Sequence, residues 1–132
     1  MRNRFLGITG FFCLILAAIP ALAHHSAQSQ FNLDKEVTVA GMITRVDFVN
    51  PHGYLYIDQK EGDKVTKWAF ELIGPGALRK AGLGRGSGAM KIGDLVTVTA
   101  ASSKDGTNSG LVRDIKLPDG RDVVLWTNDP NQ

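Results

Sequence analysis

The sequence predicts a mainly β protein, a small barrel of five or six strands with one short helix between the third and fourth strands. Segments in which apolar and polar residues alternate, or in which valine and threonine dominate, recur after about residue 36. A two-residue period of this kind is typical of strands with one buried face. Combinations of glycine, proline, asparagine and aspartate separate the segments and indicate turns.

The first 23 residues have the pattern of a cleavable export signal. Arg2 and Arg4 precede an apolar run from Phe5 to Ala18, and a small-residue pattern ends at Ala23. The run is roughly 14 residues long, whereas a helix needs roughly 20 to cross a bilayer. We therefore predict cleavage after Ala23, a periplasmic or secreted mature protein, and no stable membrane anchor once the signal is removed.

Composition excludes several classes of protein. Cys13 lies in the apolar run, so the mature chain has no cysteine for a disulfide framework. Loss of Arg2 and Arg4 reduces the 15 basic residues to 13, equal to the 13 acidic residues. A formally neutral chain with interspersed charges lacks the concentrated basic face that nucleic acids and anionic membranes require. We therefore predict no nucleic-acid partner.

The mature chain is long enough for one domain with one core. We predict an N-terminal arm over residues 24–35, an OB-like barrel domain over 36–127 and a polar tail over 128–132. Phe31 and Leu33 are the apolar residues with which the arm can dock. In the first strand the apolar positions change parity at Gly41, which predicts a bulge or sharp bend in one long strand.

Two further strands follow the first. The turn sequence Asn50-Pro51-His52-Gly53 precedes a predicted strand over Tyr54–Gln59. A third strand is predicted over Val65–Leu72, where large apolar residues alternate with polar or small ones. The large residues, which we expect in the core, are Trp68, Phe70 and Leu72.

The second half of the domain contains the helix and the last strands. Gly74-Pro75 opens the segment Gly76–Ala81, which fits a helix of one or two turns, and residues 84–88 are predicted to form a loose loop. Later strands are predicted over Leu95–Ala101, Gly110–Leu117 and Arg121–Trp126. This order matches the OB-fold, a five-stranded barrel. An open sandwich of the same strands is the structural alternative.

Several short motifs are distributed over the mature chain: His24-His25-Ser26, Asn50-Pro51-His52, Trp68–Leu72 followed by Gly74-Pro75, Gly93-Asp94 before Val96-Thr97-Val98, Lys104-Asp105-Gly106, and Leu117–Gly120. In this combination the chain resembles a family of small bacterial exported proteins catalogued as domain of unknown function 6152. The resemblance covers essentially the whole mature chain and implies an exported small β domain. It implies no activity and no substrate.

The three histidines, His24, His25 and His52, are the candidate metal ligands. After cleavage, His24 would offer its α-amine and an imidazole nitrogen to one ion. A second imidazole, from His25 or His52, would complete a three-nitrogen site suited to Cu(II), the one cofactor that the sequence favours. Asn50 and Glu71 are candidate supporting residues, Glu71 either as a carboxylate that orients a histidine or as an acceptor for the nearby helix start. The alternative is that the histidines are ordinary tail and turn residues.

A metal-free hypothesis uses the barrel face. OB-folds commonly bind partners across one face and its flanking loops. Tyr54, Tyr56 and Trp126 would then contact a protein or stack on a sugar or peptide. The alternative is that both tyrosines are ordinary sheet residues and that Trp126 covers an open barrel end.

Sequence motifs for catalysis are lacking: the mature chain has no cysteine nucleophile, no Gly-x-Ser-x-Gly elbow, no phosphate loop and no HExxH pattern. We therefore predict a non-enzymatic exported binding protein whose first candidate ligand is copper. A metal-free OB-fold interaction module for a protein, peptide or saccharide is the alternative, and a structural component of the cell envelope is a third.

Overall fold

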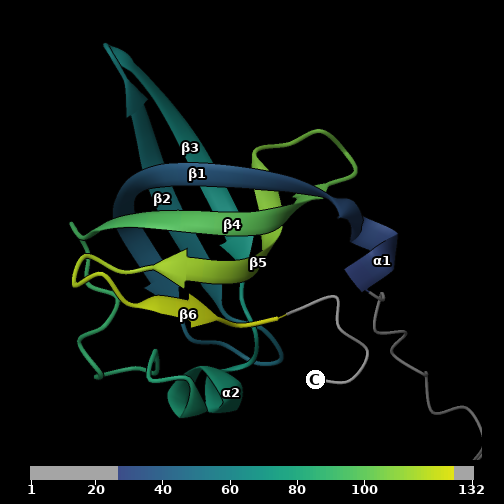
Figure 1. Ribbon diagram of the computed structural model, residues 1–132. Helices are drawn as coiled ribbons and strands as arrows, with labels where there is room; N and C mark the ends of the chain where they lie inside the picture. The colour runs from purple at the N-terminus through teal and green to yellow at the C-terminus, as the bar shows by residue number, and fades with distance from the viewer. Residues whose placement is uncertain (1–26, 127–132) are drawn as a thin grey trace, which may run out of the picture.

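The computed structural model describes residues 27–126, which form one six-stranded sheet that closes on itself (Figure 1). The elements are α1 (Ala27–Gln30), β1 (Phe31–Asp47), β2 (Tyr54–Glu61), β3 (Lys64–Glu71), α2 (Pro75–Lys80), β4 (Leu95–Ser103), β5 (Ser109–Lys116) and β6 (Asp122–Val124). The predicted order of three strands, one short helix and two or three further strands is confirmed, with three strands after the helix. The predicted export signal and polar tail lie outside the described residues. Within residues 27–126, no helix is long and apolar enough to cross a membrane.

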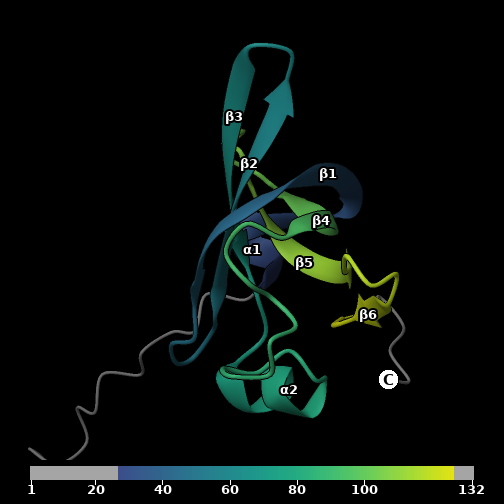
Figure 2. The same ribbon diagram turned by 90° about the vertical axis from the view of Figure 1, so that its left-hand side faces the viewer.

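Strand pairing closes the sheet into a barrel. The neighbours run β3-β2-β1-β4-β5-β6, and β3 also pairs with β5. This closing contact is parallel and joins Ala69–Glu71 to Ser109–Leu111, whereas the other pairings are antiparallel. The fold is therefore an OB-like barrel and not an open sandwich. Figures 1 and 2 show the β2–β3 hairpin extending beyond the barrel and α2 lying below it.

Strand β1 is long, bent and shared by two neighbours. Its first part pairs with β4 and its second part with β2. The predicted irregularity lies between Ile43 and Arg45, where the register with β2 shifts, and not at Gly41. Gly41 instead allows β1 and β2 to lie close together, because a Cβ there would lie only 2.7 Å from the carbonyl oxygen of Asp58. The close approach of β1 and β2 thus requires glycine.

Strand β1 begins at Phe31, inside the segment 24–35 that was predicted to be an arm. Phe31 is buried with Ala101 and Leu111 in a small second core cluster, and Leu33 packs against it. The sequence pattern did not reveal this part of the strand because the register with β4 shifts shortly after the strand begins. The expected docking of the two apolar residues is confirmed, but they dock as part of a strand.

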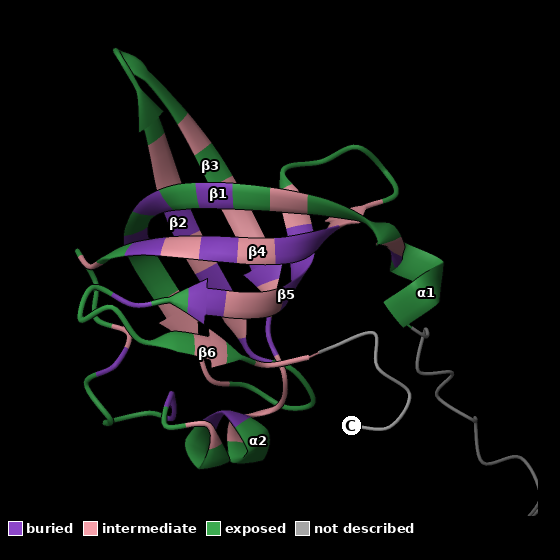
Figure 3. Ribbon diagram, viewed as in Figure 1, coloured by how far each residue is buried: buried purple, intermediate pink, exposed green. Residues whose placement is uncertain are grey.

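The main core fills the barrel (Figure 3). Phe70 and Leu72 are fully buried, as predicted. Trp68 is half-buried at the margin of the core, with its ring stacked on that of Phe70 at a centroid distance of 5.6 Å. Leu78 of α2 and Leu83 after it are also fully buried, and each contributes about 1.5–3 kcal/mol by leaving water. The segment after α2 is therefore anchored to the core through Leu83.

Candidate functional site

Of the three predicted metal ligands, the structure describes His52, and His24 and His25 lie outside the described residues. His52 lies in the turn before β2, and its side chain is 46% exposed. Its Nδ1 contacts Oε1 of Glu71 at the end of β3. The two residues meet because Tyr54, at the start of β2, is the register partner of Glu71.

Backbone hydrogen bonds hold the turn that carries His52. The Gly53 N–H donates to the carbonyl of Ile73 at 3.2 Å, and the Gly53 carbonyl accepts from the Leu72 N–H at 2.8 Å. Gly53 is itself buried, so the turn is tied to the segment between β3 and α2. The position of the imidazole next to β3 therefore follows from the backbone and not from the side chain alone.

Asn50 is exposed and precedes a cis peptide bond to Pro51. No hydrogen bond joins its side chain to His52 in the described part of the chain. The turn nevertheless packs closely, since a Cβ on Gly74 would lie 2.8 Å from the carbonyl oxygen of Pro51. Asn50 thus belongs to the loop that carries His52, without a side-chain hydrogen bond to its ring.

The contact with Glu71 determines which nitrogen of His52 is available to a ligand. A carboxylate accepts hydrogen bonds, so in the neutral imidazole the proton lies on Nδ1 and the lone pair on Nε2. Nε2 has no hydrogen-bond partner among residues 27–126. Metal-bound histidines commonly donate their second N–H to a carboxylate in this manner. Within the same residues, no group of three or more His, Cys, Asp or Glu is placed to hold a metal ion, so His52 offers a single ligand.

Tyr54 stands beside this pair. Burial raises the pKa of its phenol, and the negative charge of Glu71 raises it further. The phenol is therefore neutral at physiological pH. Tyr54 belongs to the surroundings of Glu71 and does not line the pocket described next.

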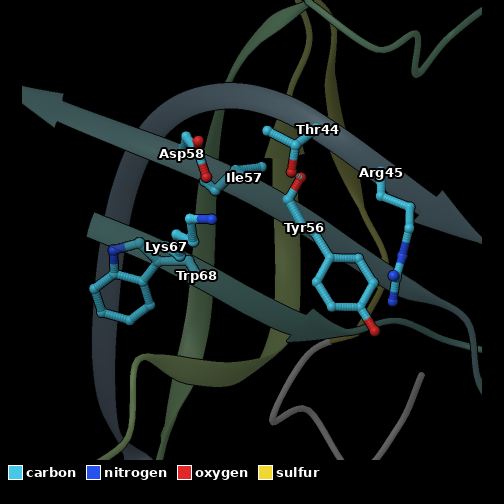
Figure 4. Close-up of a pocket in the computed structure, with 7 residues that line it drawn as sticks. All are labelled: Thr44, Arg45, Tyr56, Ile57, Asp58, Lys67 and Trp68. Carbon is cyan, nitrogen blue, oxygen red and sulfur yellow. Dashed lines mark hydrogen bonds between the residues drawn. The ribbon is translucent and has the colours of Figure 1, made fainter. Parts of the chain in front are cut away.

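A pocket of about 240 Å³ lies on β1, β2 and β3 (Figure 4). Its lining consists of Thr44, Arg45, Tyr56, Ile57, Asp58, Lys67 and Trp68. The guanidinium carbon of Arg45 is 3.9 Å from the centroid of the Tyr56 ring, and the same guanidinium pairs with Asp47 at 2.9 Å. Figure 4 shows Arg45 alongside this ring and the indole of Trp68 at the other side of the pocket.

The pocket is rigid on its aromatic side and charged with both signs. Trp68 Nε1 donates to Oε1 of Gln59 at 3.0 Å, and its ring is stacked on the core. Asp58 and Lys67 are register partners on β2 and β3, yet they form no ion pair with each other. Such a site can stack on a ring face and can both donate and accept hydrogen bonds.

Of the three aromatic residues predicted to contact a ligand, Tyr56 lines the pocket. Trp126 lies elsewhere, with its ring centroid 5.2 Å from the guanidinium carbon of Arg113 on β5. The sequence analysis did not select Arg45 or Lys67. Arg45, Tyr56 and Lys67 lie on three neighbouring strands, so the sequence shows that they belong to one pocket only when the strand register is known.

The closed barrel, with its helix after the third strand, places this protein in the class of small OB-fold proteins and is consistent with a small non-enzymatic binding module. A family model described as "Family of unknown function (DUF6152)" matches residues 13–113. The chain therefore belongs to this family, as the sequence motifs indicated. A search of curated proteins finds no match.

Solved structures confirm the fold. Two crystal structures of the mitochondrial single-stranded DNA binding protein Rim1 from S. cerevisiae are similar to this chain, with a TM-score of 0.51 for each. Their sequence identities are 14% and 15%, and the similarity covers 64% of this chain and 93% and 92% of the two Rim1 chains. At such low identity the likeness shows the fold alone.

Proposed function

We propose that this protein is an exported, non-enzymatic OB-fold protein that binds Cu(II) in the periplasm. The ligands would be Nε2 of His52 together with the α-amine and imidazole of His24, which signal cleavage would make the first residue. The observation that carries the proposal is the contact between His52 and Glu71, because it orients the ring and leaves Nε2 exposed.

The fold supports a short path from His24 to this nitrogen. Glu71 is the parallel register partner of Leu111, about 5 Å away across the ladder, and Leu111 packs against Phe31. From Phe31 back to His24, α1 spans about 1.5 Å per residue and an extended chain about 3.3 Å per residue, or roughly 16 Å in all. The mature N-terminus can therefore reach the side of the barrel where Glu71 and His52 lie.

The ligand chemistry selects Cu(II). An amine and two imidazoles form an all-nitrogen set, and Cu(II) stands at the top of the affinity order for such donors. All three nitrogens must be free of protons to bind a metal, so copper competes with protons for them. Copper binding should therefore weaken as the pH falls. His25 is an alternative source of the second imidazole.

The test is isothermal titration of Cu(II) into protein purified after export, with His24 verified as the first residue by mass spectrometry. We expect one-to-one binding that weakens markedly when one alanine is added before His24 and when His52 is replaced by alanine. Tyr56→Ala is the matched control, since Tyr56 lines the separate pocket, and it should bind copper as the unaltered protein does. Binding no tighter than that of an exposed histidine pair would refute the copper proposal. Loss on extension without loss in His52→Ala would assign the second imidazole to His25.

The pocket in Figure 4 favours a second candidate function, the metal-free binding of a saccharide. A half-buried indole can stack on a sugar ring, and the opposite charges of Asp58 and Lys67 can bond its hydroxyl groups. The small volume suits one ring of a larger chain and not a whole large ligand. Because acidic and basic groups alternate on this face, we do not extend the nucleic-acid binding of Rim1 to this protein.

Titration with a panel of oligosaccharides tests this candidate, with two-dimensional NMR to locate the contact. Tyr56→Ala and Lys67→Ala should each abolish binding, whereas Trp126→Ala is the control because Trp126 lies against Arg113. An added residue before His24 should have no effect. Ligand-induced shifts confined to residues outside the pocket would refute this assignment.

A further inference from the structure

A larger groove, of about 650 Å³, lies where β1 passes from β4 to β2. Its volume falls within the range of about 300–1,000 Å³ that is typical of small-molecule sites. Ala40, Gly41 and Met42 contribute from β1, and residues of β2, the starts of β3 and β4, the end of β5 and the turn after it complete the lining. None of the proposed copper ligands lines it.

The walls of the groove are unusually apolar for an exposed surface. Met42, Val65 and Leu95 are 48%, 49% and 66% exposed, and each comes from a different strand. Single exposed apolar residues are normal, but here three of them line one concavity together with Leu117 and Pro118. Met42 is unbranched and flexible, so its side chain can adjust to the shape of a ligand.

The charged residues of the groove are mainly basic. Lys60 on β2 and Lys116 at the end of β5 are both exposed, and Asp58 is the single acidic residue in the lining. Neither lysine forms an ion pair or a side-chain hydrogen bond within residues 27–126. An apolar groove with two unpaired ammonium groups is complementary to a molecule with a long apolar chain and a negative head.

We infer that this groove binds a monomeric fatty acid, with the acyl chain along Met42, Val65 and Leu95 and the carboxylate at Lys60 and Lys116. The inference is independent of copper binding, because it uses other residues. Each methylene that leaves water contributes about 0.8 kcal/mol, which is about fourfold in affinity. Affinity should therefore rise about 15-fold from decanoate to dodecanoate and should stop rising once the chain fills the groove.

The experiment is isothermal titration of the exported protein with octanoate, decanoate and dodecanoate below their micelle concentrations, and with 1-dodecanol. Leu95→Asp should weaken dodecanoate at least tenfold, and its fold should persist because Leu95 is largely exposed. The double variant Lys60→Glu with Lys116→Glu should weaken dodecanoate but not dodecanol. Lys80→Glu, at an exposed lysine of α2 outside the groove, is the matched control.

Equal affinity for all three acids, or full binding by Leu95→Asp with circular dichroism unchanged, would overturn the proposal. Full binding of dodecanoate by the double lysine variant would overturn the assignment of the carboxylate. Phosphatidylglycerol vesicles provide a further arm: sedimentation with vesicles without binding of the monomeric acids would identify a membrane surface and overturn the fatty-acid proposal.

Discussion

Replacement of Gly110 by alanine should strain the barrel at the contact that closes it. Gly110 lies on β5 between its register partners Phe70 on β3 and Ser102 on β4. A Cβ at this position would lie 2.7 Å from the carbonyl oxygen of Ala101 and 2.9 Å from the Cβ of Ala100. Because these are backbone and Cβ atoms and not the ends of flexible side chains, β4 or β5 would have to move.

The expected loss in the free energy of unfolding follows from this geometry. An overpacked interior site typically loses about 1–3 kcal/mol, and with no flexible neighbour we expect the upper part of that range, about 2–3 kcal/mol. For a domain of this size, 1 kcal/mol corresponds to about 4–8 °C in Tm, so Tm should fall by roughly 8–24 °C. Gly76→Ala in α2 is the matched control, because no atom lies within 4 Å of the Cβ that alanine would add there and alanine favours a helix by about 0.5–1 kcal/mol.

Urea unfolding followed by tryptophan fluorescence measures both variants, since Trp68 is stacked on Phe70 next to the closing contact. Gly110→Ala should unfold at lower urea than the unaltered protein, and Gly76→Ala at equal or higher urea. A free energy of unfolding for Gly110→Ala within about 0.5 kcal/mol of the unaltered value would refute the close approach of β4 and β5.

Three further predictions concern charged groups. Glu71→Gln should weaken Cu(II) about 10- to 100-fold in titration while circular dichroism is unchanged, because the histidine loses its carboxylate partner. Burial raises the pKa of Asp114, so its charged form destabilises the fold at neutral pH, and this destabilisation is lost only when the pH falls below the ordinary aspartate pKa of about 3.9. Asp114→Asn should therefore raise Tm at pH 7 in thermal unfolding, and the gain should disappear at about pH 3. Arg113 is mostly buried and bonds both Glu36 and the Leu33 carbonyl, so Arg113→Ala should cost about 2–3 kcal/mol in urea unfolding, whereas Glu36→Ala, at a half-exposed partner, should cost less than about 1 kcal/mol. Equal losses of stability in Arg113→Ala and Glu36→Ala would contradict this prediction.

Much of the fold could be predicted from the sequence because its signals are local. The alternation that ends in Phe70 and Leu72 and the turn chemistry around Pro51 place β2, β3 and α2 close to their predicted bounds. The first residues of β1 were missed, since its polar residues coincide with a register shift. Leu83 was not selected as a core residue although it is fully buried, because its packing depends on how the segment after α2 meets the barrel.

The candidate site was predicted in part for the same reason. His52 and Glu71 could each be selected by residue type, but their contact depends on which residues of β2 and β3 pair. The pocket depends on three strands at once, so Arg45 and Lys67 carried no local signal. Trp68 was correctly expected to pack on the core, yet it also lines the pocket, because it is half-buried and part of its ring stays accessible.

The contact that closes the barrel joins β3 to β5, a strand that follows much later in the chain. Arg113 contacts Glu36 across 77 positions, and Lys104 contacts Gln28 across 76. A topology of such high contact order folds slowly, because distant segments must meet before contacts between them stabilise the chain. Until β5 has been made, β3 has no partner along its closing edge. For a protein exported as we propose, the nascent chain would stay open while it crosses the membrane and would close once its last strands arrive on the far side.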